Sequence, residues 1–399
     1  MSVNGLRRVT VVGGSLAGFR TAEALRNEGF EGTIRIVGAE DELPFDRPPL
    51  SKQVLAGTWE PERARLRGAD EVDAEWLLGR RATALDVATR TVTLETGERI
   101  DGDAVVIATG AAPRRLPAAV APPDLGGVHV LRTITDCLAL ATDLEGSPRV
   151  VVIGAGFIGS EVAATAKGRG LDVTVIEALP VPLERILGAR MGELCARLHT
   201  DNGVTVRLGV AVAGLEGGND GRVARVRLAD GEAVEADVVV VGVGVAPETG
   251  WLEGSGLTLA DGVVCDARCL AAPGIVAAGD VARWYHEGVG EEMRVEHWTN
   301  AAEQAHAAAR TLLHGQAAPV YSPVPYFWSD QYKTKIQFVG HSHPGDDVEV
   351  VEGSVDEGRF VAAYGRHGRL VGALLWNRAA RIAHWSEKLA AGSPFPGVP

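Results

Sequence analysis

The sequence predicts an α/β protein with two Rossmann-like dinucleotide-binding domains and a smaller C-terminal α+β domain. Two observations predict the first part: a strand, a glycine-rich turn and a helix follow one another near the start, and the pattern returns in mid-chain. A third observation predicts the last domain. After the Pro-rich stretch HGQAAPVYSPVPY, the strand-like runs KIQFVG, VEVVEG, FVAAYG and LVGALLW replace the βα units, and RAARIAHWSEKLAAG predicts a final helix closed by Gly392.

The first nucleotide-binding pattern begins with the strand RRVTVV and the stretch VVGGSLAGFRTAEALRNEG. Apolar residues at helical spacing follow the turn and end near Gly29. The next strand, TIRIVG, ends close to Glu40, where such units place an acid against a ribose. The turn and the helix start supply the candidate contacts Gly13, Gly14, Ser15, Leu16, Ala17 and Gly18.

Ser15 stands where the fingerprint has its second glycine, at which the backbone approaches the pyrophosphate. Serine adds one small polar atom, and its hydroxyl can donate a hydrogen bond to a phosphate oxygen. We therefore expect the turn to bind a nucleotide that many further contacts also hold, as they would a resident flavin.

The second pattern, RVVVIGAGFIGSEVAATAKGRGLDVTVIE, contains the complete fingerprint and ends its second strand at Glu177. Helix–strand packing without a nucleotide is the alternative, but two such units in one chain favour binding. A carboxylate at Glu177 accepts hydrogen bonds from ribose hydroxyls and repels a 2′-phosphate, so we expect NADH to be preferred over NADPH. The candidate contacts are Gly154, Gly156, Phe157, Ile158, Gly159, Glu177 and Arg185.

Three further strands run into turns of small residues, which let the backbone pass close to a cofactor. An acid at such a strand end can accept a hydrogen bond from a ribityl hydroxyl, and a helix N-cap is the alternative role. The segments DAVVIATGAAP, DVVVVGVGVAP and GIVAAGDVA supply Ala108, Thr109 and Gly110, then Gly242 and Gly244, then Gly279 and Asp280.

Taken in order, PFDRPPLSK, VVIGAGFIGSEVAATA, AAGDVA, VEHWTNAAEQA and PYFWSDQY resemble the FAD-dependent NADH:ferredoxin reductases of bacterial oxygenase systems, of the putidaredoxin reductase and biphenyl dioxygenase reductase type. The resemblance extends to about Asn377; Ser15, APET and a short tail depart from the family pattern. It implies a glutathione-reductase-like fold. Its domains would be an FAD-binding domain of residues 1–113 and 246–318, an NAD-binding domain of residues 114–245 and a C-terminal domain of residues 319–399.

The resemblance also implies that Lys52 and Glu161 are catalytic, with the lysine beside the hydride-accepting nitrogen of the flavin and the glutamate as its partner. A cation there stabilises the negative charge of flavin reduction, and a carboxylate makes its burial tolerable. From the residues alone, Lys52 could be a surface lysine, Ser51 could cap a helix starting near it, and the tryptophans could be core residues. The further FAD contacts implied are Arg47, Ala82, Arg132, Glu296, His297, Trp298 and Trp328.

The activity implied is hydride transfer from NADH to FAD, then single-electron transfer to a two-iron two-sulfur ferredoxin that serves a monooxygenase or a ring-hydroxylating dioxygenase. A flavin disulfide reductase, NADH oxidase or peroxidase would need an early redox cysteine, and the stretch from Asp46 to Trp59 has none. The other rival is a flavoprotein similar to apoptosis-inducing factor that binds partners or nucleic acid. The net charge of −13 and the absence of basic blocks weigh against it.

Composition excludes several other classes. The four cysteines form no CxxC pair, and neither His297 nor HSHPGDD resembles a metal site, so we expect no metal. No apolar run is long enough to span a membrane, and the N-terminus lacks a signal-peptide pattern. We therefore expect a cytoplasmic monomer or weak homodimer that binds neither membranes nor nucleic acid, with Lys333 and Lys335 near the ferredoxin docking site.

Overall fold

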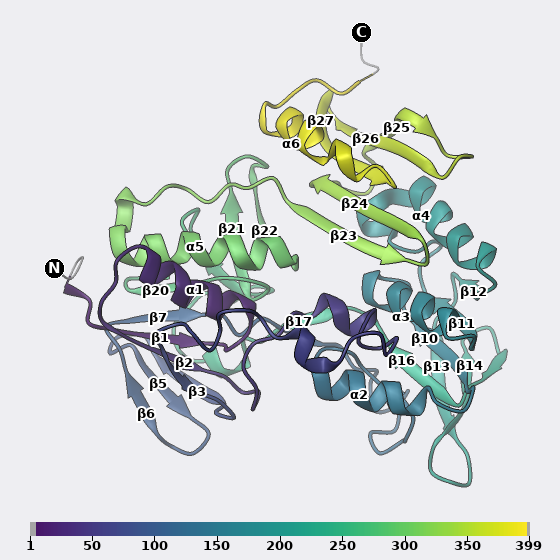
Figure 1. The fold of residues 1–399 in the computed structure, drawn as a ribbon, viewed down its shortest axis with the longest axis horizontal. Coiled ribbons are helices and arrows are strands. Elements are labelled where there is room, and N and C mark those ends of the chain that lie inside the picture. The colour runs from purple at the N-terminus through teal and green to yellow at the C-terminus, as the bar shows by residue number, and fades with distance from the viewer. Residues whose placement is uncertain (1–4, 397–399) are drawn as a thin grey trace. The chain divides into compact units, whose positions relative to one another are not determined.

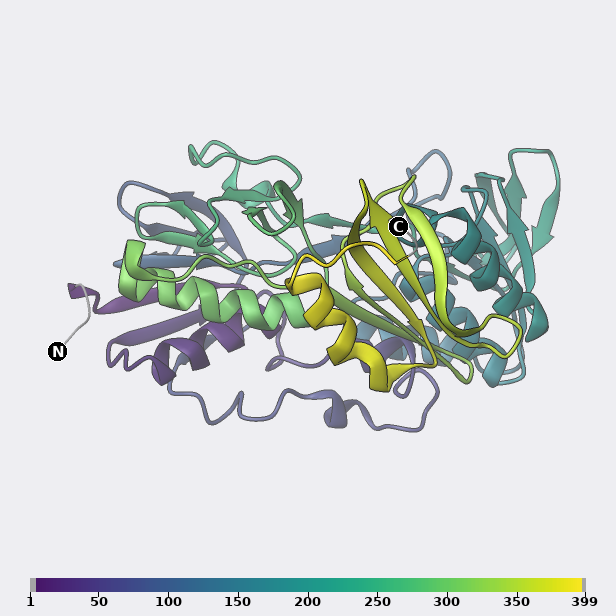
Figure 2. The same cartoon turned by 90° about the horizontal axis from the view of Figure 1, so that it is seen from above.

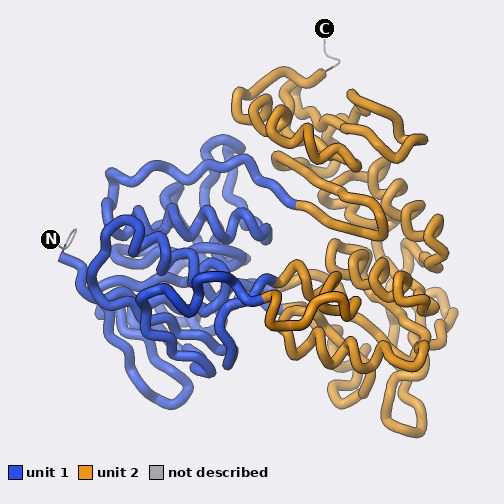
Figure 3. The backbone as a smooth tube through the Cα atoms, viewed as in Figure 1, with its two compact units in different colours: residues 1–46, 65–112, 246–327 blue, residues 47–64, 113–245, 328–399 orange. Residues whose placement is uncertain are grey.

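The computed structural model describes residues 5–396, which form two compact units (Figure 3). Of the described residues, the first unit comprises those up to 46 with 65–112 and 246–327, and the second comprises 47–64, 113–245 and those from 328 onward. Each unit is thus assembled from three separate stretches of chain. The three domains predicted from the family resemblance divide the chain more finely, and that division stays a prediction.

The first unit is built on a six-stranded sheet in the order β19-β20-β7-β1-β2-β3, in which all pairs except β19–β20 are parallel. Continuous apolar runs form its central strands because both faces are buried, as the fully buried β7 illustrates. Helices α1 and α5 lie side by side along this sheet (Figure 1). The bounds are β1 (Arg8–Val12), α1 (Leu16–Asn27), β2 (Thr33–Val37), β3 (Glu75–Leu77), β7 (Ala104–Ile107), β19 (Leu270–Ala272), β20 (Ile275–Ala277) and α5 (Trp298–His314).

Two three-stranded sheets complete the first unit, in the orders β4-β5-β6 and β18-β21-β22. Two short strands, β8 (Ala111–Pro113) and β17 (Val245–Pro247), pair where the chain passes from one unit to the other. The remaining bounds are β4 (Ala82–Asp86), β5 (Thr91–Leu94), β6 (Arg99–Asp101), β18 (Val263–Cys265), β21 (Ala282–His286) and β22 (Glu291–Arg294).

The second unit repeats the nucleotide-binding architecture with a parallel sheet in the order β12-β11-β10-β16-β9. A small antiparallel sheet, β13-β14-β15, accompanies it. The bounds are β9 (Val128–His129), α2 (Ile134–Asp143), β10 (Arg149–Ile153), α3 (Phe157–Gly168), β11 (Asp172–Glu177), α4 (Glu184–Asp201), β12 (Thr205–Leu208), β13 (Val212–Gly217), β14 (Val223–Leu228), β15 (Ala233–Glu235) and β16 (Val238–Val241).

The C-terminal part of the second unit is a five-stranded sheet in the order β23-β24-β27-β26-β25, with α6 against one face (Figure 2). All four predicted strands and the final helix are confirmed, and Gly392 follows that helix with a φ of 61°. The bounds are β23 (Tyr326–Gln331), β24 (Thr334–Gly340), β25 (Asp347–Ser354), β26 (Arg359–Arg366), β27 (Arg369–Trp376) and α6 (Ile382–Ala390).

The structure contains neither of two helix caps that the sequence left open as alternatives. Pro48–Ser51 is a short 3-10 helix that ends at Lys52, so Ser51 closes a turn instead of capping a new helix. The backbone at Lys52, with φ −125° and ψ −100°, is not helical, so no helix continues from Ser51. Asp280 precedes strand β21 and not a helix, so it has no helix to cap.

Among the described residues, no helix combines the length and hydrophobicity that a bilayer crossing requires.

Candidate functional site

The first glycine-rich turn is pressed against the end of β7. A Cβ at Gly13, where φ is 121°, would lie 2.0 Å from the main-chain oxygen of Ala108. A Cβ at Gly18 would lie 1.8 Å from the main-chain oxygen of Gly13. Any larger residue at either position would push the turn away from the sheet, so both positions require glycine.

The second position of the fingerprint is different, and this explains Ser15. In the second unit a Cβ at Gly154 would approach the oxygen of Gly242 to 2.4 Å, whereas a Cβ at Gly156 would meet nothing closer than 3.9 Å. The turn itself therefore has room for a side chain at its second position. Ser15 has an extended backbone immediately before α1, as Gly156 has before α3. The serine is compatible with the same turn.

Both fingerprint helices begin in a way that suits an anion. Neither residue before them caps its helix with a side chain, and neither helix has an acid in its first turn. Main-chain N–H groups and the positive end of the helix dipole are then available to a pyrophosphate. The residues present therefore fit the phosphate groups of two dinucleotides, one for each unit.

In the first unit, the turn at Gly279 and Asp280 packs against the start of α1, since a Cβ at Gly279 would lie 2.9 Å from the Cβ of Ala17. The N–H of Gly279 donates to the side-chain oxygen of Gln304 on α5 at 2.9 Å. Arg294 donates to the main-chain oxygen of Asp280 at 3.1 Å. The fingerprint turn, the end of β7 and this turn thus come together at one edge of the sheet.

The other FAD candidates of the first unit have the following contacts and positions. Thr109 donates to the main-chain oxygen of Glu248 at 2.8 Å, and the Trp298 indole donates to Asp46 at 2.7 Å. The ring of His297 lies against that of Phe327 at a centroid distance of 5.0 Å. In addition, Glu296 forms an ion pair with Arg294, Ala82 begins β4, and Glu40 follows β2.

The nucleotide candidates of the second unit surround the turn after β10. The Glu177 carboxylate accepts hydrogen bonds from the N–H of Ala155 at 2.7 Å and from that of Leu179 at 2.9 Å. It therefore holds the fingerprint turn, and its predicted contact with a ribose stays a prediction. A Cβ at Gly242 would lie 3.3 Å from the Cα of Gly159, so the end of β16 meets α3 closely. Gly244 follows with a φ of 95°, Phe157 and Ile158 begin α3, and Arg185 lies in the first turn of α4, which breaks at Gly188.

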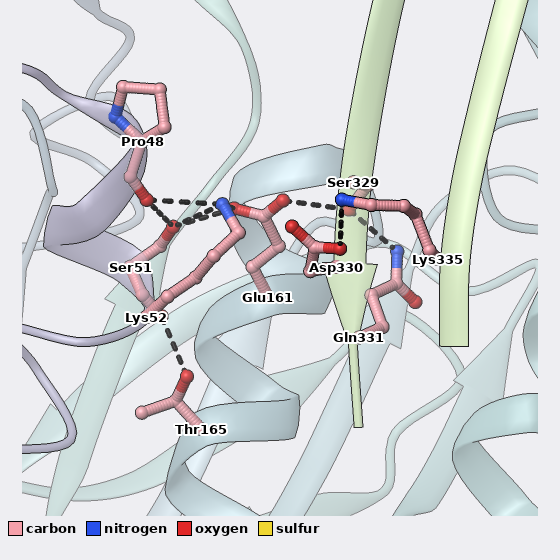
Figure 4. Close-up of polar contacts among 9 residues, drawn as sticks. All are labelled: Pro48, Ser51, Lys52, Glu161, Thr165, Ser329, Asp330, Gln331 and Lys335. Carbon is pink, nitrogen blue, oxygen red and sulfur yellow. Dashed lines mark hydrogen bonds and ion pairs between the residues drawn. The ribbon is translucent and has the colours of Figure 1, made fainter. Parts of the chain in front are cut away.

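Lys52 and Glu161 form a buried ion pair, with the lysine Nζ 2.5 Å from the glutamate Oε2 and side-chain exposures of 13% and 3% (Figure 4). Lys52 also donates to the main-chain oxygen of Pro48 at 3.1 Å. Ser51 donates to the same glutamate oxygen at 2.6 Å. The partners that the resemblance implied are in contact; their catalytic role stays a prediction.

One face of α3 positions this pair. Glu161, Thr165 and Arg169 recur every four residues and so lie above one another on the helix. Thr165 donates to the main-chain oxygen of Ser51 at 2.7 Å, and Arg169 donates to that of Leu55 at 3.1 Å. Together they fix the segment that carries Lys52 along the helix.

Arg47 and Arg132, two predicted FAD contacts, meet at the start of α2. The Arg47 guanidinium donates to the main-chain oxygen of Arg132. Asp136 accepts from the N–H groups of Arg132 and Thr133, and the Thr133 hydroxyl accepts in return from the N–H of Asp136. This capping box fixes the backbone that carries Arg132.

Sequence reasoning missed the serine and glutamine that lie on β23. Ser329 and Gln331 are fully buried, whereas Trp328 and Asp330 are partly exposed, in alternation along the strand. Ser329 donates to Glu161 at 2.8 Å. The polar residues at alternate positions in PYFWSDQY were the available signal.

Comparisons with known proteins agree with these features. The family model described as "Pyridine nucleotide-disulphide oxidoreductase" matches residues 7–305, and that described as "Reductase C-terminal" matches residues 326–396. Rhodocoxin reductase of Rhodococcus erythropolis is 39% identical, covering 88% of this chain and 82% of its own. Putidaredoxin reductase of Pseudomonas putida is 36% identical, covering 94% of this chain and 90% of its own.

Among solved structures, the covalent complex of putidaredoxin reductase with putidaredoxin contains a chain that matches with a TM-score of 0.92 and 33% identity, over 97% of this chain and 94% of that one. The resemblance found in the motifs and the predicted fold class are therefore confirmed. The chain belongs to the pyridine nucleotide-disulphide oxidoreductase family and, within it, to the ferredoxin reductases of oxygenase systems.

Proposed function

We propose that the chain is an FAD-dependent NADH:ferredoxin oxidoreductase that passes electrons singly to a two-iron two-sulfur ferredoxin of an oxygenase system. Bound FAD supplies the change from two-electron to one-electron chemistry. The chain's own residues bind and orient the two nucleotides and set the electrostatic field around the reacting groups. The family membership and the names of relatives such as rhodocoxin reductase support this assignment.

For FAD we propose a site on the first unit, where the fingerprint turn 13–18, the turn 108–110 and the turn 279–280 share one edge of the sheet. The start of α1 binds the pyrophosphate through its N–H groups. Asp280 accepts from a ribityl hydroxyl, while Gln304 and Arg294 hold its turn in place. NADH occupies the corresponding turn of the second unit, beside Glu177.

The buried ion pair between Lys52 and Glu161 is the main structural support for the proposal. Burying a lysine and a glutamate away from water is costly unless both are paired and hydrogen-bonded, and this chain satisfies both. We propose that the Lys52 ammonium stabilises the negative charge that develops on hydride acceptance, while Glu161 keeps the ammonium in position.

The cysteines distinguish this function from that of a disulfide reductase. All four are free and buried. Burial raises the pKa of Cys137 to about 11, with a further contribution from Asp136, and raises the pKa of Cys195 to about 12. Such thiols are poor nucleophiles. We also propose a cytoplasmic location, where reduced thiols and NADH coexist.

For the ferredoxin we propose docking near Trp328, Lys333 and Lys335, since positive side chains steer acidic partners. Lys335 forms an ion pair with Asp330 at 2.8 Å, which offsets part of its charge. Lys333 is therefore expected to contribute more than Lys335. Charge reversal at Lys333 should raise the Michaelis constant for a cognate ferredoxin and leave ferricyanide reduction unchanged. An equal response of the two acceptors would remove the docking assignment.

The test of the main proposal is anaerobic stopped-flow reduction of the Lys52→Ala holoprotein by NADH. We expect FAD to stay bound and its reduction to slow by about 10- to 1000-fold, since one electrostatic contact to the reacting group is lost. Lys388→Ala, which removes a partly exposed lysine beside Trp385, is the matched control and should reduce at the wild-type rate. Wild-type reduction of Lys52→Ala would exclude the proposed role of Lys52.

A further inference from the structure

Glu161 has a hydrogen-bond donor on each of its two carboxylate oxygens. Its Oε2 accepts hydrogen bonds from the side chains of Ser51 and Lys52, which both belong to the segment that follows Arg47. Its Oε1 accepts a hydrogen bond of 2.8 Å from the hydroxyl of Ser329, which lies on strand β23 of the C-terminal sheet (Figure 4). Ser329 therefore fixes the half of the carboxylate that does not face the lysine.

The direction of the Ser329 hydroxyl is itself fixed. The side-chain nitrogen of Gln331 donates to the Ser329 oxygen at 3.2 Å. A hydroxyl has only one proton, and an amide nitrogen can only donate. With Gln331 occupying an acceptor site of the serine oxygen, the serine proton points to Glu161. Gln331 thus donates to Ser329, Ser329 donates to Glu161, and Lys52 donates to the other oxygen of the same carboxylate.

Gln331 takes part in these hydrogen bonds at some cost to the stability of the folded protein. Its side-chain oxygen is buried and, among the described residues, accepts no hydrogen bond. An unpaired buried carbonyl destabilises the folded state, so packing alone does not explain an amide at this position. Both residues are fully buried on the same face of β23, as alternate residues of a strand must be. The Gln331 amide does, however, orient the Ser329 hydroxyl.

We propose that Ser329, oriented by Gln331, is a positioning residue for hydride transfer that acts on the Lys52 ammonium through Glu161. The C-terminal sheet then contributes to the electrostatics of the reaction, in addition to any contact with the ferredoxin. This inference rests on the proposed function, in which Lys52 stabilises the developing charge.

The expected sign follows from the charges. The positive end of the Ser329 hydroxyl dipole faces the carboxylate and offsets part of its negative charge. Ser329→Ala leaves that charge less compensated and leaves Glu161 free to turn away from Lys52. Both changes make negative charge near the lysine less favourable. The flavin should become harder to reduce, and hydride transfer should slow.

The test compares Ser329→Ala with the wild-type holoprotein in two measurements. We expect the flavin midpoint potential to fall and the reduction rate at saturating NADH to decrease about 3- to 30-fold, with unchanged NADH affinity and FAD content. A tenfold change in the reduction equilibrium of a two-electron couple corresponds to about 30 mV. Gln331→Met, which removes the orienting donor and also the unpaired oxygen, should give a smaller change of the same sign. It keeps the test available if Ser329→Ala folds poorly.

Two further variants make the result specific. Thr311→Val removes another buried hydroxyl, which donates to the main-chain oxygen of Arg268 at 2.6 Å, and should leave potential and rate unchanged. In a Glu161→Ala background, Ser329→Ala should add nothing further, because its effect passes through the carboxylate. A wild-type potential and rate for Ser329→Ala would overturn the proposal, and so would an undiminished effect in the Glu161→Ala background.

The failure of this proposal is distinguishable from failure of the proposed function. If Lys52→Ala slows flavin reduction while Ser329→Ala changes neither potential nor rate, only the positioning role fails. If Lys52→Ala and Ser329→Ala both behave as the wild type, the proposed function of the ion pair fails as well.

Discussion

Glu177 illustrates how one side chain serves both structure and recognition. Its two oxygens accept main-chain N–H groups from Ala155 and Leu179, which ties the fingerprint turn to the end of β11. Each carboxylate oxygen has a second lone pair, so hydrogen bonds from ribose hydroxyls remain possible. The negative charge also remains, and it repels a 2′-phosphate.

We therefore expect NADH to be used with at least about tenfold higher catalytic efficiency than NADPH, a difference that needs only about 1.4 kcal/mol. Glu177→Gln should reduce this preference because the repulsive charge is lost. Steady-state rates with ferricyanide and each coenzyme measure it. Equal efficiencies in the wild type would mean that Glu177 does not face the ribose.

His199 provides a residue-scale prediction about pH. It is fully buried on α4, with its Nδ1 2.7 Å from the Tyr332 hydroxyl, and burial lowers its pKa to about 4. A histidine in the unfolded chain has a pKa of about 6.5. Between these values the unfolded state binds more protons, so the free energy of unfolding falls as the pH decreases, by at most about 1.4 kcal/mol per pH unit.

His199→Gln cannot titrate, so its stability should depend less on pH between about 4 and 6.5. Urea unfolding of both holoproteins across this range, at a fixed FAD concentration, measures the difference. Above neutral pH the two curves should run parallel. Equal slopes in the acidic range would show that His199 is not the group that titrates.

At the scale of elements, helix α3 joins two tasks. Its first turn forms part of the second fingerprint, and its Glu161–Thr165–Arg169 face fixes residues 47–64. Thr165→Val removes the donor to the buried Ser51 carbonyl and keeps the side chain's shape. We expect a loss of about 1–3 kcal/mol in the local stability of this segment, or roughly a tenfold faster opening for each 1.4 kcal/mol.

Native-state hydrogen exchange of residues 47–64 measures this opening. Thr200→Val is the control, because the Thr200 hydroxyl donates to Arg197 at an exposed end of α4. Unchanged exchange in Thr165→Val would show that the helix face does not hold the segment.

The sequence predicts some elements well and others poorly for a physical reason. Both fingerprint units and the C-terminal strands follow from local spacing, since turn glycines and periodic apolar residues act within about 30 positions. The contact of Ser329 with Glu161 joins residues far apart in the chain, and serine has no distinctive pattern of its own. The helix expected after Ser51 is absent because the backbone leaves the helical region at Lys52, which no pattern in the sequence indicates.

At the scale of the whole molecule, the buried cysteines separate this chain from members of its family that use a redox disulfide. Burial raises the pKa of Cys265 to about 12 and raises that of Cys269 well above its usual value, so few thiolates exist at neutral pH. We expect the native holoprotein to react only slowly with a maleimide and to keep its NADH:ferricyanide activity. After unfolding, all four thiols should react. Fast labelling of one thiol with loss of activity would contradict this account.

The most direct test of the central claim is an anaerobic titration of the FAD-loaded protein with NADH, followed by addition of an oxidised two-iron two-sulfur ferredoxin from an oxygenase system. The account predicts that about one equivalent of NADH bleaches the flavin absorption, because a hydride delivers two electrons. About two equivalents of ferredoxin should then restore it, one electron each. A flavin that stays oxidised with excess NADH, or a reduced flavin that ferricyanide reoxidises and no such ferredoxin does, would contradict it.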